Sequence, residues 1–164
     1  MKSLIVFFSH SENTKKVAGY IKGLMEDSDV FEVVPQEPYP DDFMKCLEVG
    51  REQIEKDILP VFKDGPTDLS GYDIIFIGSP NWYNTMVPVI KSFLKSYDFT
   101  GKTIAPFCTH GTKGAYKVFE DMKQVAKGAS FLPGFGAYSQ AMDEKTELEV
   151  KFWLTGCGLI EQKQ

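Results

Sequence analysis

The feature that most limits the folds open to this chain is the alternation of short apolar runs with amphipathic, helix-like segments. Residues 4–8 and 74–77 are apolar at every position, which is typical of strands that are buried on both faces. Such strands, separated along the chain by helices, favour a parallel sheet that helices cover on both sides. We therefore expect an α/β fold.

The expected strands and helices follow one another regularly along the 164 residues. The last strand is the weakest, because Pro133, Gly134 and Gly136 interrupt it. Two later glycines, at 156 and 158, suit the end of the last helix. The Pro-rich stretch 35–40 is expected to be a stiff connection within one domain that spans residues 1–164. The expected strands are 4–8, 30–34, 73–78, 102–107 and 131–138, and the expected helices are 13–25, 42–58, 87–96, 115–126 and 144–155.

Composition and charge exclude several classes of protein. No apolar run approaches the roughly 18 residues that a membrane helix needs, and the N-terminus does not resemble a signal peptide. The three cysteines, Cys46, Cys108 and Cys157, are an odd and widely spaced set, which favours a reduced, cytoplasmic chain over a disulfide or zinc protein. A net charge of −5 makes nucleic acid a poor partner.

The loop after the first expected strand has the character of an anion site. Ser9, Ser11, Asn13 and Thr14 lie between this strand and the first helix, where the first amides of the helix have no intrahelical acceptor and favour negative charge. These side chains add donors without adding charge, so the pattern predicts a bound phosphate monoester. The sequence here matches neither a P-loop nor a dinucleotide-binding fingerprint. The alternative is that these residues only cap the helix.

The loop after the third expected strand contains two adjacent large aromatic residues. Trp82 and Tyr83 follow Gly78-Ser79-Pro80-Asn81, and a pair of this kind is seldom exposed without a use. An aromatic face can stack on a flat conjugated ligand. The alternative is that one of the two folds back into the core.

The loop after the fourth expected strand, residues 108–114, has two glycines and small polar residues that permit close approach of a ligand. His10 and His110 fall in two of these three loops, but no cluster of Cys or carboxylate residues accompanies them, so a metal site is not expected. For each histidine the alternative is a solvated loop residue. For Cys108 the alternatives are a thiol beside the ligand and a small buried residue.

Together these residues resemble the flavodoxin and flavodoxin-like family, the short-chain FMN-binding proteins of bacteria. The stretch 9–14 (Ser-His-Ser-Glu-Asn-Thr) resembles the hydroxyl-rich phosphate loop of that family, and 72–82 resembles its third strand and ring-binding loop. Residues 93–94, 101–103 and 106–111 resemble the following helix and the third loop. The resemblance covers nearly the whole chain. It implies a flavodoxin-like three-layer sandwich, a five-stranded parallel sheet in the order 2-1-3-4-5, and FMN as cofactor.

The resemblance also implies a role for each loop. The first loop would hold the FMN phosphate through its polar side chains and the backbone amides of His10 and Glu12. The second would contact the isoalloxazine ring, with Trp82 stacking on it, and the third would line the pyrimidine side. No catalytic residue or metal ligand is expected. The residues expected to bind FMN are Ser9, His10, Ser11, Glu12, Asn13, Thr14, Ser79, Pro80, Asn81, Trp82, Tyr83, Asn84, Cys108, Thr109, His110 and Gly111.

Two departures from the family pattern bear on function. Glu12 stands where the family usually has glycine, which puts an acid beside the phosphate at a position where a positive φ is expected. The third loop lacks the acidic residues that are common in electron-carrier members. The first hypothesis is an electron-transfer protein whose partners are redox proteins or small electron acceptors, as a monomer or weak dimer. The alternatives are an NAD(P)H-dependent reductase of quinones or other small acceptors, and a binding module without redox activity.

Overall fold

The core of the structure is a sheet of parallel strands. The computed structural model describes residues 1–162, and in that part of the chain the sheet has seven strands, of which only β4 runs antiparallel to its neighbour. The strand order is β2-β1-β3-β5-β6, with β7 also paired to β5. If β4 is left out, β5 is the fourth strand along the chain, and β6 and β7 together take the place of the fifth. The order is then the expected 2-1-3-4-5, and the flavodoxin-like α/β fold is confirmed. The strands are β1 (Ser3–Phe7), β2 (Ser28–Glu32), β3 (Ile74–Trp82), β4 (Thr85–Met86), β5 (Thr103–His110), β6 (Ser130–Phe131) and β7 (Phe135–Tyr138).

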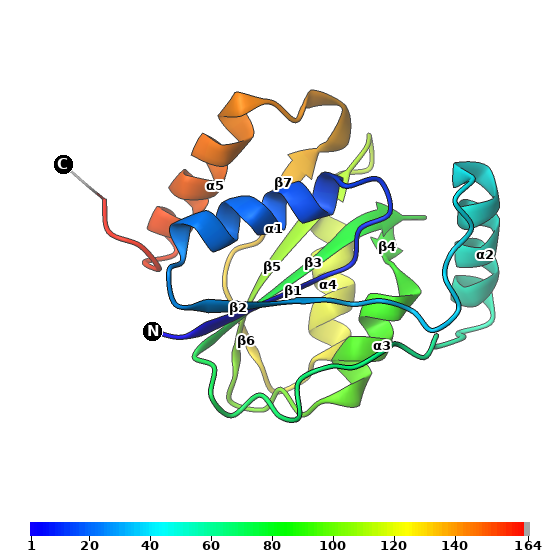
Figure 1. The fold of residues 1–164 in the computed structure, drawn as a ribbon, viewed down its shortest axis with the longest axis horizontal. Helices are drawn as coiled ribbons and strands as arrows, with labels where there is room; N and C mark the ends of the chain where they lie inside the picture. The colour runs from blue at the N-terminus through cyan, green and yellow to red at the C-terminus, as the bar shows by residue number, and fades with distance from the viewer. Residues whose placement is uncertain (163–164) are drawn as a thin grey trace.

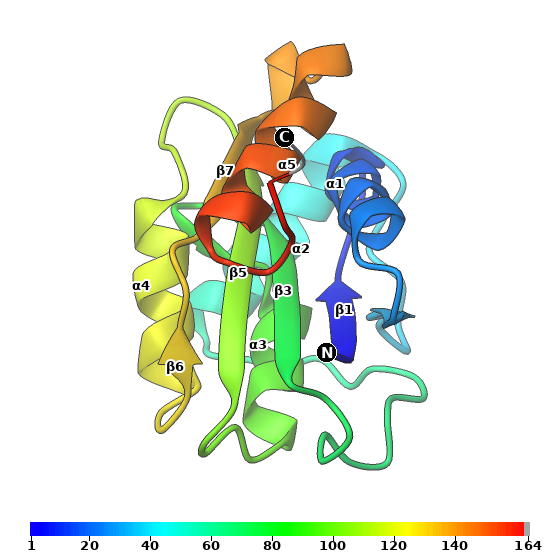
Figure 2. The ribbon, with the colours of Figure 1, turned by 90° about the vertical axis from the view of Figure 1, so that its left-hand side faces the viewer.

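Helices cover both faces of the sheet, which gives three layers (Figures 1 and 2). Val17 and Ile21 of α1 and Val150 of α5 are fully buried in one apolar cluster, together with one face of the central strands. Phe93 of α3 and Met122 of α4 belong to a second cluster, on the other face. The helices are α1 (Asn13–Leu24), α2 (Phe43–Glu55), α3 (Pro88–Ser96), α4 (Tyr116–Val125) and α5 (Glu144–Gly156), with a 3₁₀ turn at Ser139–Ala141.

The register of the sheet brings the carboxyl ends of β1, β3 and β5 to one edge. Phe7 at the end of β1 lies beside Gly78 of β3, and Pro80 of β3 lies beside Thr109 of β5. Ligands of open parallel α/β sheets bind beyond this edge. The three loops that the sequence singles out therefore meet at one end of the molecule.

Strands β3 and β5 extend further than the sequence predicts. The expected strand 73–78 continues to Trp82, and the expected strand 102–107 continues to His110. Residues 79–82 and 108–110, which we expected in loops, are thus strand residues. The two strands pair with each other as far as Pro80 and Thr109. Beyond that, residues 81–82 pair with β4 and His110 pairs with β7.

Other boundaries differ because single residues interrupt the pattern. The expected strand 131–138 is divided into β6 and β7, since Pro133 has no amide to donate to the ladder. The helix expected to reach residue 58 ends at Glu55, and Asp57 adopts a left-handed φ of 49°. Strand β2 begins and ends two residues before the expected 30–34.

Candidate functional site

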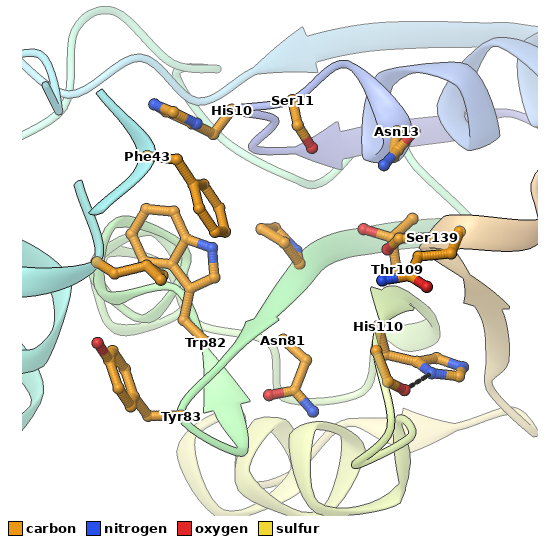
Figure 3. Close-up of a pocket in the computed structure, with 14 residues that line it drawn as sticks. His10, Ser11, Asn13, Phe43, Asn81, Trp82, Tyr83, Thr109, His110 and Ser139 are labelled. Atoms are coloured by element: carbon orange, nitrogen blue, oxygen red, sulfur yellow. Dashed lines mark hydrogen bonds between the residues drawn. The ribbon is translucent and has the colours of Figure 1, made fainter. Parts of the chain in front are cut away.

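A cavity of about 480 Å³ opens at the carboxyl edge of the sheet, where the three loops meet. Figure 3 shows polar side chains of the first loop facing those of the third across it, with Trp82 and Phe43 at one end. Ten of the expected site residues line the cavity, and four lining residues were not expected. The fourteen are His10, Ser11, Asn13, Phe43, Leu47, Pro80, Asn81, Trp82, Tyr83, Thr109, His110, Gly111, Ser139 and Gln140.

The first loop presents the N-terminus of α1 to the cavity. Within residues 1–162, the backbone amides of Asn13 and Thr14 have no hydrogen-bond acceptor, as expected for the first residues of a helix. Ser9 accepts a hydrogen bond from the amide of Lys15 at 3.2 Å, so Ser9 does cap the helix. Ser11 and Asn13 line the cavity instead. The loop therefore combines unpaired amides, the positive end of the helix dipole and two neutral polar side chains, which suits an anion.

Glu12 adopts a left-handed conformation, with φ 68° and ψ −9°, as expected from its place where the family usually has glycine. Its side chain is two-thirds exposed and lies 3.8 Å from the Lys15 ammonium. It does not line the cavity. A left-handed conformation is strained for a residue with a Cβ, and this strain lies directly before the first residue of α1.

Replacing Glu12 with glycine is therefore expected to stabilise the fold. The left-handed conformation costs an L residue roughly 1–2 kcal/mol, and part of that gain is lost because glycine is more flexible in the unfolded chain. We expect the free energy of unfolding to rise by about 1 kcal/mol, measured by urea denaturation. Glu12→Gln, which removes the charge and keeps the strain, should stay within about 0.5 kcal/mol of the native chain. A Glu12→Gly chain less stable than the native one would contradict this account.

Thr14 connects the first loop to the third. Its hydroxyl lies 2.8 Å from the hydroxyl of Thr109, 95 residues away in the sequence, and both residues are buried. The Thr14 hydroxyl therefore already has a hydrogen-bond partner within the protein, although the sequence predicts that it binds the phosphate. Its backbone amide, in the first turn of α1, has no acceptor among residues 1–162.

The energetic coupling between Thr14 and Thr109 should be measurable in the free energy of unfolding of single and double variants. Thr14→Val leaves the Thr109 hydroxyl buried without its partner, which is expected to cost about 1–2 kcal/mol of unfolding free energy. In the double variant Thr14→Val/Thr109→Val no hydroxyl is left unpaired, so its cost should be clearly smaller than the sum of the two single costs. Additive costs in urea denaturation would show that the pair does not couple the loops.

Trp82 and Tyr83 occupy different environments at the end of β3. Trp82 is only 4% exposed, and its indole makes edge contacts with the rings of Tyr39 and Phe8, at centroid distances of 5.0 and 5.7 Å. Tyr83 is 51% exposed. The open aromatic surface of this loop therefore belongs mainly to Tyr83, whereas Trp82 presents an edge of its indole. The stacking role of Trp82 stays a prediction.

A tight turn explains why Tyr83 is exposed. Trp82 pairs with Thr85 across the β3–β4 hairpin, so only Tyr83 and Asn84 lie between the strands. Both have positive φ, 53° and 61°, the signature of a two-residue type I′ turn, which normally favours Asn or Gly. A tyrosine held in this conformation is strained, and such strain is concentrated at functional sites.

Helix α2 supplies lining residues that the sequence did not indicate. Phe43 and Leu47 line the cavity, although Phe43 is 55% exposed. At Gly50 the helix packs closely against Trp82, since a Cβ at this position would lie only 2.7 Å from the indole ring. His10 donates a hydrogen bond from Nε2 to the Pro40 carbonyl at 2.9 Å, which ties the first loop to the segment before α2. No local pattern in the sequence indicates that α2 reaches the cavity.

The third loop contributes Thr109, His110 and Gly111 to the opposite wall, with Ser139 and Gln140 beside them. Nδ1 of His110 donates to the Gly111 carbonyl at 2.8 Å. Burial raises the pKa of the Cys108 thiol to about 12, so Cys108 is a buried thiol and not a reactive thiolate.

The remaining expected residues lie beside the cavity and not in its wall. Ser79 is fully buried and uses its hydroxyl to accept from the Val87 amide at 2.9 Å. Asn84 lines a neighbouring recess, and Ser9 a smaller hollow behind His10.

The charge of the cavity suits an anionic, aromatic ligand. None of its lining residues is Asp or Glu, and the two histidines and Tyr83 are its titratable groups. Among residues 1–162 no three His, Cys, Asp or Glu side chains gather closely enough to hold a metal ion. No helix in the same range is long and apolar enough to cross a membrane. The site combines unpaired amides in one loop with aromatic side chains in another, which is the arrangement needed to hold a flat ring with an anionic tail.

Comparison with known proteins agrees with this geometry. The family model described as flavodoxin matches residues 2–156. A search of curated proteins finds no match. Among solved structures, a flavoprotein of Lactobacillus acidophilus NCFM in complex with FMN is 28% identical, with 93% of this chain and 97% of that chain covered and a TM-score of 0.73.

Two further structures show the same fold at lower identity. A protein of Bacteroides eggerthii DSM 20697 is 21% identical, with 97% of this chain and 99% of that chain covered and a TM-score of 0.81. Oxidised flavodoxin 2 from Bacillus cereus is 20% identical, with 96% and 98% covered and a TM-score of 0.62.

Proposed function

Because the chain belongs to the flavodoxin family, we propose that it transfers electrons through a flavin held at the carboxyl edge of its sheet. Its cofactor is FMN. When bound, the flavin supplies the redox chemistry, and the protein supplies binding, orientation and electrostatics. One observation carries the proposal. The amides without acceptors at the start of α1 and the aromatic residues at the end of β3 lie at the same cavity.

In this proposal the residues of each cavity wall contact a different part of the flavin. The amides of Asn13 and Thr14 and the side chain of Ser11 hold the phosphate. Trp82, Tyr83 and Phe43 contact the ring and exclude water from it, and Asn81 is fixed beside them by a 2.7 Å hydrogen bond from its amide nitrogen to the Gly114 carbonyl. Thr109, His110 and Gly111 lie along the polar edge of the ring.

A direct test is reconstitution of the purified chain with FMN or riboflavin, followed by anaerobic titration with dithionite. We expect FMN to be retained more tightly than riboflavin, because only FMN carries the phosphate. Reduction in two separate one-electron steps would support a carrier that works with redox proteins. A chain that retains neither flavin would contradict the proposal and leave a binding module without redox activity.

A second function, NAD(P)H-dependent reduction of quinones or other small acceptors, is favoured by one observation. No carboxylate lines the cavity, so the site lacks the negative charge that helps a carrier to control its flavin and to dock on basic partners. Reduction of bound FMN in one two-electron step, with steady-state NADPH oxidation in the presence of a quinone, would identify the chain as this oxidoreductase. For either function we propose a cytoplasmic protein that is a monomer or weak dimer.

A further inference from the structure

Helix α5 has apolar side chains on two opposite faces. Val150 and Leu154 are buried on the inner face, where α5 packs on α1 and the sheet. Leu148 and Phe152 lie on the opposite face, because each is two positions from Val150 along a helix with about 3.6 residues per turn. They are 50% and 65% exposed, and α5 lies in an outer layer of the molecule (Figures 1 and 2). One turn apart on the same face, these two residues form an apolar ridge that points away from the protein.

Charged side chains flank this ridge on both sides. By the geometry of the helix, Glu144 and Lys151 lie along one side of it. Lys145 and Glu149 lie along the other side. In the described part of the chain, none of the four makes an ion pair with another side chain. Each side of the ridge therefore offers one acid and one base to a second surface.

These charges match when the ridge meets a copy of itself. Around a twofold axis the same face of both copies is in contact, so every contact between two different residues occurs twice. If the two α5 helices run antiparallel, with Leu148 packed on Leu148 near the axis, Glu144 of one copy lies opposite Lys151 of the other. Lys145 and Glu149 meet in the same way on the other side of the ridge. Parallel helices would instead set each residue level with its own copy, so that Lys145 would face Lys145.

We propose that two copies of this chain associate through the outer face of α5, with the two helices antiparallel. The two ridges form the apolar centre of the contact, and the ion pairs lie on both sides of it. Each helix has 13 residues and is about 20 Å long, so one helix pair makes a small interface and a weak, concentration-dependent dimer. None of the ridge or flanking residues lines the flavin cavity, so the association and the proposed flavin function can each stand without the other.

The first test removes the ridge. The dimer dissociation constant of the full chain is measured by sedimentation equilibrium over a series of protein concentrations, with and without added FMN. We expect Phe152→Gln to weaken association at least about tenfold, because both copies lose a ring from the contact. The matched control is Tyr116→Gln, which should change nothing, since Tyr116 is 77% exposed but lies on α4, over the other face of the sheet. Circular dichroism checks that each variant is folded.

The second test reverses the flanking charges. Lys151→Glu and Glu144→Lys each set like charges opposite one another at two symmetric places, and a loss of about threefold per exposed pair gives association about tenfold weaker. In a mixed dimer of the two variants, opposite charges face each other again at both places. An equal mixture should therefore associate about as tightly as the native chain. Glu144 and Lys151 lie about two turns apart on one helix, too far to pair within one copy, so this recovery requires contact between copies.

Three results would overturn the proposal. A native chain that stays monomeric at the highest concentration would leave the outer face of α5 to a different partner. A dimer that Phe152→Gln leaves as tight as the native one would place the contact elsewhere. A mixture that associates no more tightly than either charge variant alone would exclude the antiparallel pairing. Retention of FMN, read from the visible spectrum of the same samples, decides the proposed function separately.

Discussion

Replacing Gly78 with alanine is expected to lower the free energy of unfolding by about 3 kcal/mol, at the upper end for overpacking of a core. A Cβ at this position would lie 2.1 Å from the Phe107 ring, which faces Gly78 from the neighbouring strand. Phe107 is fully buried, so its ring has no free space into which it can rotate. The strain must therefore move β3 or β5, the two strands that carry the cavity walls.

Gly71 provides the matched control for this experiment. A Cβ there meets nothing within 4 Å, and φ is not in the left-handed region. Gly71→Ala should therefore change the unfolding free energy by no more than about 0.5 kcal/mol. Both variants are compared with the native chain by urea denaturation. A Gly78→Ala chain as stable as Gly71→Ala would show that the sheet accommodates the added methyl group and that the close approach is not required.

Replacing Ser11 with aspartate should cause the largest loss of FMN affinity, about 100-fold, which corresponds to about 3 kcal/mol. Ser11 lines the cavity next to the amides at the start of α1. Two unit charges about 4 Å apart near a protein surface repel by about 4 kcal/mol, and rotation of the exposed side chain into solvent reduces that cost. Riboflavin, which has no phosphate, should lose little affinity. Flavin fluorescence titration measures both dissociation constants.

Ser11→Asn separates the effect of charge from the effect of size. Asparagine has nearly the same shape as aspartate but no charge, so its FMN affinity should stay within about threefold of the native value. An equal loss of FMN and riboflavin in Ser11→Asp would place the phosphate elsewhere. Raising the salt concentration should recover part of the FMN affinity of Ser11→Asp, because the repulsion is partly screened.

Much of the fold could be predicted because the signals for it are local. The apolar run 74–77 lies in β3 and the run 4–8 lies in β1 except for Phe8, and all nine residues are buried. The alternation with helices was sufficient for the parallel sheet. The ends of the elements were less predictable. Strand β3 continues to Trp82 and β5 to His110 because they pair with each other and then with β4 and β7. The sequence of one strand does not indicate which other strand will pair with it.

In the candidate site, too, the sequence predicts what depends on local signals and misses what depends on packing between distant segments. The polar loop before α1 was predictable because a strand, a helix start and neutral polar residues are adjacent in the sequence. The places of Phe43 and Leu47 in the cavity wall were not predictable. They lie there because α2 packs against the end of β3, with Gly50 against the Trp82 indole. The Thr14–Thr109 contact joins residues 95 positions apart, and no local pattern indicates such a pair.

The sequence by itself determined the order of strands and helices and the polar loop between β1 and α1, since each depends on neighbours along the chain. Only the tertiary structure decided that Trp82 is buried, that Tyr83 is exposed, and that Thr14 contacts Thr109. Burial and proximity depend on which distant segments occupy the space around a residue. That space is fixed only when the sheet and its helices have packed together.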